Sequence, residues 1–100
     1  MSRDDARRTL VAYDIPDDGR RKRLSKLLQS FGDRVQYSVF VVDCSPARML
    51  RLRQKVQLLI DPRVDSVLYC DLGPVASLTR EVFSWDGSAR AVTPQETIVV

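Results

Sequence analysis

Asp14 is the side chain in this sequence best placed to do chemistry, because it stands where a strand-like segment, residues 8–14, gives way to a loop. Magnesium and manganese prefer carboxylate oxygens, completed by water and substrate phosphates. The same carboxylate could instead cap the next turn or pair with Arg20 or Arg21. From the residues alone, a metal-binding role and a structural role are therefore both open for Asp14.

A single carboxylate makes a poor site for Mg²⁺ or Mn²⁺, and a second one improves it. In a twofold-symmetric homodimer whose axis passes between the first strands, Asp14 and its symmetry mate would face each other. The pair could then hold one metal ion over a phosphodiester, polarising a phosphoryl oxygen and activating water. Nearby arginines would neutralise the charge that develops. The metal-binding hypothesis is therefore that Asp14 is a magnesium (or manganese) ligand at a dimer axis.

Basic side chains are concentrated in the first half of the chain. Residues 1–55 contain 13 Lys/Arg and 7 Asp/Glu, whereas residues 56–100 contain 3 Lys/Arg and 6 Asp/Glu. Such segregation favours a polyanionic partner, although a short basic run is often only the solvated face of a helix. The residues that we expect to contact RNA or DNA are Arg20, Arg21, Arg23, Lys26, Arg34 and Ser38.

The chain contains no histidine, which removes the usual general base and every Ser-His or Cys-His nucleophile pair. Chemistry must therefore depend on carboxylates, a metal ion, lysine or arginine. Cys44 and Cys70 lack the spacing of a metal or redox motif, so we predict two small buried hydrophobes in a reducing compartment. No apolar run approaches the roughly 18 residues that cross a bilayer. This predicts a soluble, cytoplasmic protein without membrane contact.

The elements that would position these residues begin with the strand that ends on Asp14. Apolar residues at helical spacing then predict an amphipathic helix that opens after residues 15–19 and ends at Gly32. Residues 34–43 give the strongest strand signal, and this strand can bend or split near Phe40. Its alternation places Phe40 on the same face as Ser38, where an aromatic ring either packs or stacks on bases, packing being the commoner role.

Ser45 as N-cap and Pro46 at the first helical position predict a second helix through Ile60, which is followed by a strand at residues 66–72. The order is therefore strand, helix, long or paired strand, helix, strand. It predicts a ferredoxin-like α+β sandwich, in which two helices lie on one face of an antiparallel sheet. We expect one domain over residues 1–100.

The C-terminal segment, residues 74–100, has a weaker pattern. Residues 81–85 predict a strand, and the apolar run 97–100 predicts a short strand at the end of the sequence. An apolar edge strand needs a partner, and the sheet of a second subunit is an obvious one. We therefore predict a dimerisation segment whose last strand is added to the partner's sheet.

Residues 10–73 resemble the Cas-two family of CRISPR-associated proteins. The resemblance depends on the conjunction of YDIPDD (13–18), a basic amphipathic helix, GDRVQYSVF (32–40) and DSVLY (65–69), because any one piece alone would be weak. It implies a ferredoxin-like homodimer of a CRISPR adaptation module. Such a protein works with the Cas-one integrase in spacer acquisition, when short DNA segments are captured into the repeat array.

The resemblance implies two alternative functions. One is a metal-dependent endonuclease that hydrolyses phosphodiester bonds of single-stranded RNA or double-stranded DNA, with magnesium bound by Asp14. The other is a non-catalytic adaptor that binds duplex DNA and bridges integrase dimers. A ferredoxin-like ligand-binding or interaction module is a third, poorer alternative. The residues that match family positions implicated in activity are Tyr13, Asp14, Arg21, Arg23, Arg34 and Phe40.

Overall fold

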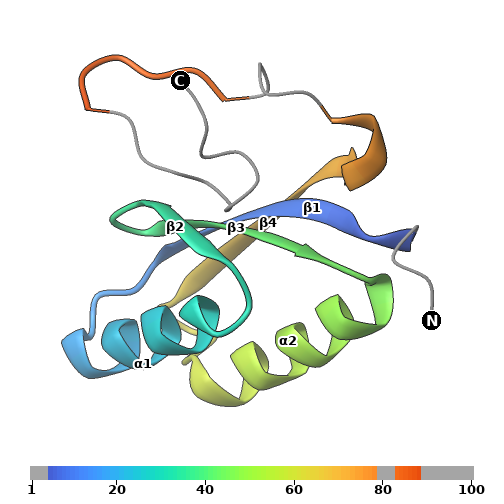
Figure 1. Cartoon of the computed structure of the whole chain (residues 1–100). Helices are drawn as coiled ribbons and strands as arrows, with labels where there is room; N and C mark the ends of the chain where they lie inside the picture. Colours follow the sequence, from blue (N-terminus) through green and yellow to red (C-terminus); the bar gives the residue numbers. More distant parts are fainter. Residues whose placement is uncertain (1–4, 79–82, 89–100) are drawn as a thin grey trace.

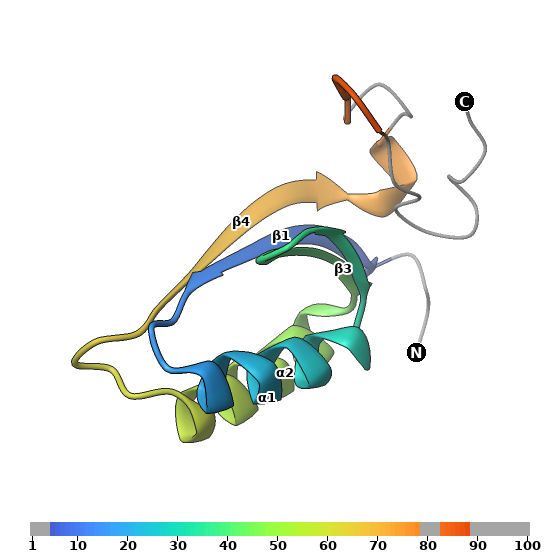
Figure 2. The ribbon, with the colours of Figure 1, turned by 90° about the vertical axis from the view of Figure 1, so that its left-hand side faces the viewer.

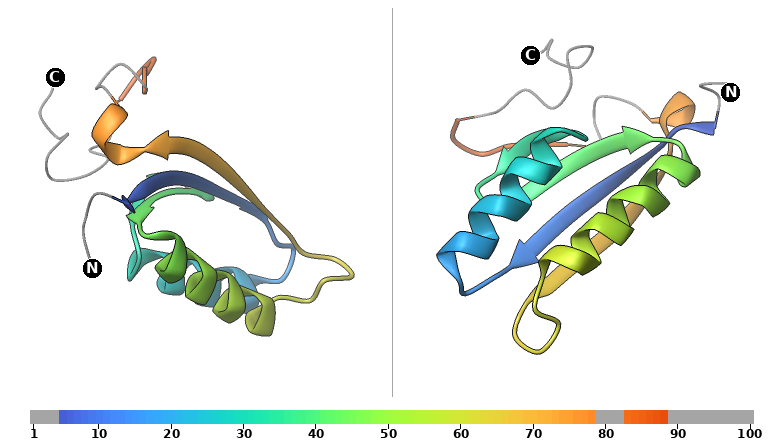
Figure 3. Two further views of the ribbon diagram at one scale, coloured as in Figure 1. Left: turned by 90° about the vertical axis from the view of Figure 1, so that its right-hand side faces the viewer. Right: turned by 90° about the horizontal axis from the view of Figure 1, so that it is seen from below.

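The computed structural model describes residues 5–78 and 83–88, arranged as a sheet with both α-helices on one of its faces (Figure 1). The two layers are seen edge-on in Figure 2 and from further directions in Figure 3. The elements are β1 (Arg7–Asp14), α1 (Asp18–Gln29), β2 (Asp33–Gln36), β3 (Val39–Cys44), α2 (Pro46–Leu59), β4 (Ser66–Pro74) and the short 3₁₀ helix η2 (Val75–Ser77).

The four strands form one antiparallel sheet in the order β2-β3-β1-β4. This order, with a helix after β1 and another after β3, is the ferredoxin-like arrangement. The α+β fold class predicted from the sequence is thereby confirmed. Because β1 is a central strand, its last residue, Asp14, lies beside Ser66 at the start of β4.

Helix α1 begins after a capping aspartate, Asp17, and ends shortly before a glycine, Gly32. The carboxylate of Asp17 accepts a hydrogen bond from the backbone N–H of Arg20 at 2.8 Å, which caps the N-terminus. The chain then leaves the helix before Gly32. A Cβ on Gly32 would lie 2.1 Å from the carbonyl oxygen of Val41, so only glycine lets α1 approach β3 this closely.

Helix α2 packs beside α1 and turns an apolar stripe towards the core. Ser45 caps its N-terminus and Pro46 takes its first position, as expected. Leu52 and Val56 are buried, and Met49 is partly buried against them. Neither α1 nor α2, the α-helices of the described ranges, is long and apolar enough to cross a membrane.

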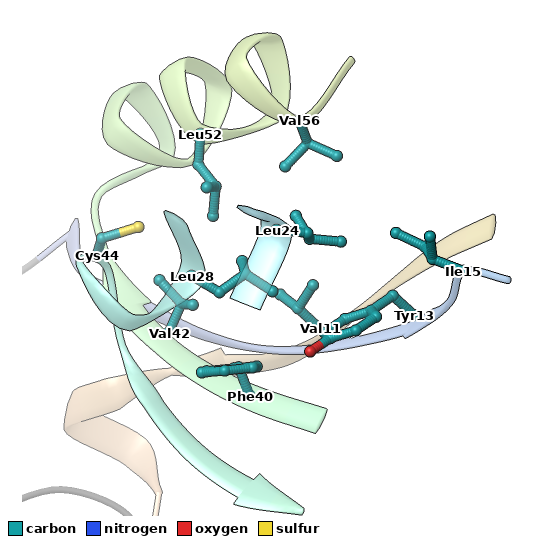
Figure 4. Packing of buried hydrophobic residues seen from close by; sticks show 10 residues of the cluster. All are labelled: Val11, Tyr13, Ile15, Leu24, Leu28, Phe40, Val42, Cys44, Leu52 and Val56. Atoms are coloured by element: carbon teal, nitrogen blue, oxygen red, sulfur yellow. The ribbon is translucent and has the colours of Figure 1, made fainter. Parts of the chain in front are cut away.

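The core lies between the helices and the sheet, and side chains from both layers meet there (Figure 4). Phe40 is the largest of its fully buried side chains, with no exposed surface. Its ring stacks on that of Tyr13, with the centroids 6.3 Å apart and 22° between the planes. The buried members are Val11, Tyr13, Ile15, Leu24, Leu28, Phe40, Val42, Cys44, Leu52 and Val56.

The long strand expected at residues 34–43 is divided into β2 and β3 by a turn at Tyr37 and Ser38, slightly before the expected break. The turn interrupts the alternation, so Tyr37 is 69% exposed whereas Val35 is buried. Phe40 points into the core between the sheet and the helices. Of its two expected roles, packing is therefore the one that the structure shows.

Two expectations outside this region are wrong. Cys70 is exposed, whereas Cys44 is buried as expected, and both thiols are free. Phe83 to Trp85, within the strand expected at 81–85, do not form a strand. The rest of that segment and the apolar run 97–100, with its expected addition to a partner's sheet, lie outside the described residues.

Candidate functional site

Asp14 ends β1 with its carboxylate exposed to solvent. Side chains alternate along the strand, and Val11 and Tyr13 belong to the core beneath the helices. Asp14 therefore lies on the face of the sheet that the helices leave open. Tyr13 and Asp14 therefore point to opposite faces of the sheet.

The carboxylate of Asp14 makes no hydrogen bond or ion pair with any of the residues that the structure describes. Its two expected partners are engaged elsewhere. Arg21 donates to the carbonyl oxygen of Ile15 at 2.8 Å and pairs with Asp18. The cap of α1 is Asp17. The structural role that the sequence left open for Asp14 is therefore not observed, and both carboxylate oxygens are available to a ligand.

Arg20, expected to contact nucleic acid, forms a bidentate ion pair with Asp65, 2.6 Å from Nε to Oδ2 and 3.0 Å from Nη2 to Oδ1. The Asp65 side chain is fully buried and also accepts from the backbone N–H of Asp61 at 2.8 Å. Hydrogen bonding from Arg20 is the main cause of a lowered pKa for Asp65. Arg20 thus ties the start of α1 to the loop between α2 and β4.

We expect Asp65→Asn to lower the thermal unfolding midpoint at pH 7, because the variant leaves the Arg20 guanidinium beside a neutral amide. The folded-state pKa of Asp65 is lowered, so its ionised form stabilises the fold above about pH 4, the usual range of an unfolded aspartate. That stabilisation is lost as the pH falls through the folded-state pKa.

The measurement is the midpoint of wild type and variant between pH 7 and pH 2.5. The gap between them should be widest near neutrality and should narrow in acid. Asp86→Asn, which changes an exposed carboxylate, is the control and should follow the wild type throughout. A gap that is constant across this range would show that the ion pair is not its cause.

A cleft of about 430 Å³ opens between α1 and the β2–β3 turn, on the helix side of the sheet. The backbone N–H of Tyr13 donates to the carbonyl oxygen of Ser38 at 3.1 Å and fixes the turn beside β1. The cleft is lined by four cations, two tyrosines and two smaller polar residues, and by no carboxylate. These residues are Tyr13, Arg21, Lys22, Ser25, Lys26, Gln29, Arg34 and Tyr37.

Arg34 is held in this cleft by contacts on several sides. Its Nη2 donates to the hydroxyl of Ser25. The guanidinium carbon lies 5.2 Å from the ring centroid of Phe40 and 5.9 Å from that of Tyr37, within the range of cation–π attraction. Its Nε is buried and has no hydrogen-bond partner in the described part of the chain. Arg34 is therefore oriented by packing, with donor capacity left over.

Arg23 and Lys26 are exposed on α1 and, within the described ranges, make no ion pair. Phe40 lies beneath Tyr13 and Arg34 and supports both of them from within the core. Its ring is out of reach of a ligand in this structure. The expected site residues thus divide into two places, with Asp14 on the open face of the sheet and Arg21 and Arg34 in the cleft.

Sequence reasoning did not identify Tyr37, Ser25, Lys22 or Gln29 as site residues. Apolar and polar residues alternate from Val35 to Val39 as in one continuous strand, so no local pattern in the sequence marks Tyr37 as a turn residue. No group of three or more His, Cys, Asp or Glu side chains in the described ranges could hold a metal ion. A metal at Asp14 would therefore take its other donors from water, substrate or a second copy.

Comparison with known proteins places these features in context. The family model described as CRISPR associated protein Cas2 matches residues 7–76. A curated relative from Rhodospirillum rubrum, CRISPR-associated endoribonuclease Cas2 3, is 45% identical over 69 residues, which cover 64% of this chain and 73% of the relative.

Two solved structures show the same fold. A hypothetical protein from Thermus thermophilus is 35% identical and superposes with a TM-score of 0.72, covering 88% of this chain and 99% of that one. The structure of Streptococcus pyogenes Cas2 at pH 6.5 is 29% identical, with a TM-score of 0.63 and coverage of 79% and 99%.

Proposed function

This chain belongs to the CRISPR-associated Cas2 family, and from that membership we propose that it is a magnesium-dependent endonuclease that hydrolyses single-stranded RNA. The observation that carries the proposal is the exposed carboxylate of Asp14, which has no partner among the described residues and stands at the end of a central strand. The name endoribonuclease, given to the relative from Rhodospirillum rubrum, supports RNA as the substrate.

The chemistry of Asp14 fits a hard divalent cation, since its carboxylate oxygens are solvated and unpaired in the described part of the chain. Mg²⁺ bound there would supply Lewis acidity and an activated water at the scissile phosphate. Asp14 holds the ion in this proposal. Arg23, an exposed cation of α1 that makes no ion pair with the described residues, binds a flanking phosphate and positions the strand.

A homodimer is part of the proposal, because one chain supplies a single carboxylate. The open face of the sheet carries Leu68, which is 59% exposed and lies opposite Ala12 in the β1–β4 register. The next pair on that face is Asp14 and Ser66. Apolar surface beside the carboxylate favours a second copy at this place. That packing would bring the partner's carboxylate towards Asp14.

A non-catalytic adaptor that binds duplex DNA, works with the Cas-one integrase and serves spacer acquisition is the second candidate. The observation that favours it is the charge of the helical layer. Helices α1 and α2 carry five and four basic residues, against Asp18 as their single acidic residue. A surface of one sign binds a phosphate backbone without needing Asp14.

Cleavage separates the two candidates. We would incubate the protein with single-stranded RNA and with duplex DNA, titrate Mg²⁺ or Mn²⁺, and use EDTA as the control. The proposal expects RNA fragments whose yield rises with the metal ion concentration and vanishes in EDTA. If neither substrate is cut at any metal concentration while salt-sensitive binding to duplex DNA persists, the endonuclease proposal is wrong and the adaptor is the better proposal.

A further inference from the structure

The cleft between α1 and the β2–β3 turn lies on the opposite side of β1 from Asp14, so hydrolysis at Asp14 leaves it without a task. We propose that this cleft binds one unpaired nucleotide of a single-stranded nucleic acid, with the base against Tyr37 and the phosphate on the cations of α1. The inference rests on the proposed function only in taking a nucleic acid as the ligand.

The size and charge of the cleft select a phosphorylated ligand of nucleotide size. Its volume of about 430 Å³ falls within the roughly 300–1,000 Å³ of small-molecule sites. Lys22 and Lys26 line it and, in the described part of the chain, make no ion pair. Because no carboxylate lines the cleft, nothing within it competes with an anion for these two ammonium groups.

Tyr37 provides the surface for a base. Tyr37 is 69% exposed in the turn between two strands, so its ring is open to a ligand. Its position is fixed by Arg34, whose guanidinium carbon lies 5.9 Å from the ring centroid. Hydrogen bonding to Asp18 is the main cause of a raised pKa for Arg21, which lines the other side of the cleft.

This arrangement discriminates between single and double strands. A base can stack on a protein aromatic ring only when it is out of its own helical stack, as in single-stranded RNA and in loops. A base pair within a duplex cannot enter between α1 and the turn without being unpaired. The cleft therefore favours single strands, whereas the outer cations of α1 and α2 attract either form.

The test measures binding in EDTA, where metal-dependent cleavage cannot occur. A short fluorescent single-stranded RNA and a duplex DNA of the same length are titrated with wild type, Tyr37→Ala and Tyr37→Phe. Stacking on one base predicts that Tyr37→Ala weakens RNA binding by about 5- to 100-fold. Tyr37→Phe, which retains the ring, should stay within about twofold of wild type, and duplex binding should be unchanged in both variants.

Two controls separate this inference from the proposed catalysis. Arg51→Ala removes an exposed cation from α2 and should weaken RNA and duplex binding to the same small extent. Asp86→Asn, which changes an exposed carboxylate outside both sites, should bind RNA as the wild type does. If Tyr37→Ala bound RNA as tightly as the wild type, or lost affinity equally for RNA and duplex, the proposal that the cleft binds an unpaired nucleotide would be wrong. Absence of RNA cleavage by wild type in Mg²⁺ would overturn the endonuclease alone.

Discussion

Asp14→Asn should lower metal-dependent RNA cleavage by about 100-fold or more, because an amide is a much weaker ligand for Mg²⁺ than a carboxylate and a bound metal contributes several kcal/mol to the transition state. The substitution keeps the size of an exposed side chain that has no partner among the described residues. The thermal midpoint should therefore stay within a degree or two of wild type. Initial cleavage rates across a Mg²⁺ titration are the measurement.

Asp17→Asn is the matched control for this experiment. It removes one negative charge three residues away, yet asparagine caps a helix about as well as aspartate, so α1 should remain intact. Cleavage by this control should be within a few-fold of wild type. If both variants lose activity equally, the loss is caused by the removal of negative charge at this end of the sheet and not by the loss of a metal ligand. An active Asp14→Asn enzyme would end the proposal that Asp14 holds the metal.

The fold could be predicted because its determinants are local in the sequence. Helix α1 has a capping aspartate, Asp17, at its start and a glycine, Gly32, soon after its end. Burial alternates from Thr9 to Asp14 in β1 and from Ser66 to Cys70 in β4. The division between β2 and β3 was harder to place, since apolar and polar residues alternate without interruption from Val35 to Val39. Only the paired register shows that Tyr37 lies in a turn.

The site could be predicted less completely because ion pairs join residues that are distant in the sequence. Arg20 was expected to bind phosphate because it lies in a basic run. It instead forms an ion pair with Asp65, which is 45 positions away in the sequence. Arg8 likewise is 2% exposed and pairs with Asp43 across β1 and β3, with its Nε 2.7 Å from Oδ1. No local pattern distinguishes such arginines from Arg23, which stays exposed.

Because Phe40 lies in the core, substituting it should affect the stability of the fold. The resemblance of the sequence implied a role in activity for Phe40, yet its ring is fully buried in the core beside Tyr13 (Figure 4). The guanidinium of Arg34 lies over the same ring. Loss of activity on truncating it therefore has a structural explanation. The cavity left by a buried phenylalanine costs about 3–5 kcal/mol, against a total stability of about 5–15 kcal/mol for a domain.

We accordingly expect Phe40→Ala to lose about 3–5 kcal/mol of unfolding free energy, and its activity with it, in proportion to the unfolded fraction. Phe40→Leu fills most of the cavity, so it should remain folded at assay temperature and keep cleavage within a few-fold of wild type. Denaturant unfolding and cleavage are measured on the same samples. Tyr37→Ala, which truncates an exposed ring three residues away, should leave the unfolding free energy unchanged. A folded but inactive Phe40→Leu protein would mean that the ring acts on the reaction itself, which a side chain with no exposed surface can do only if the core opens.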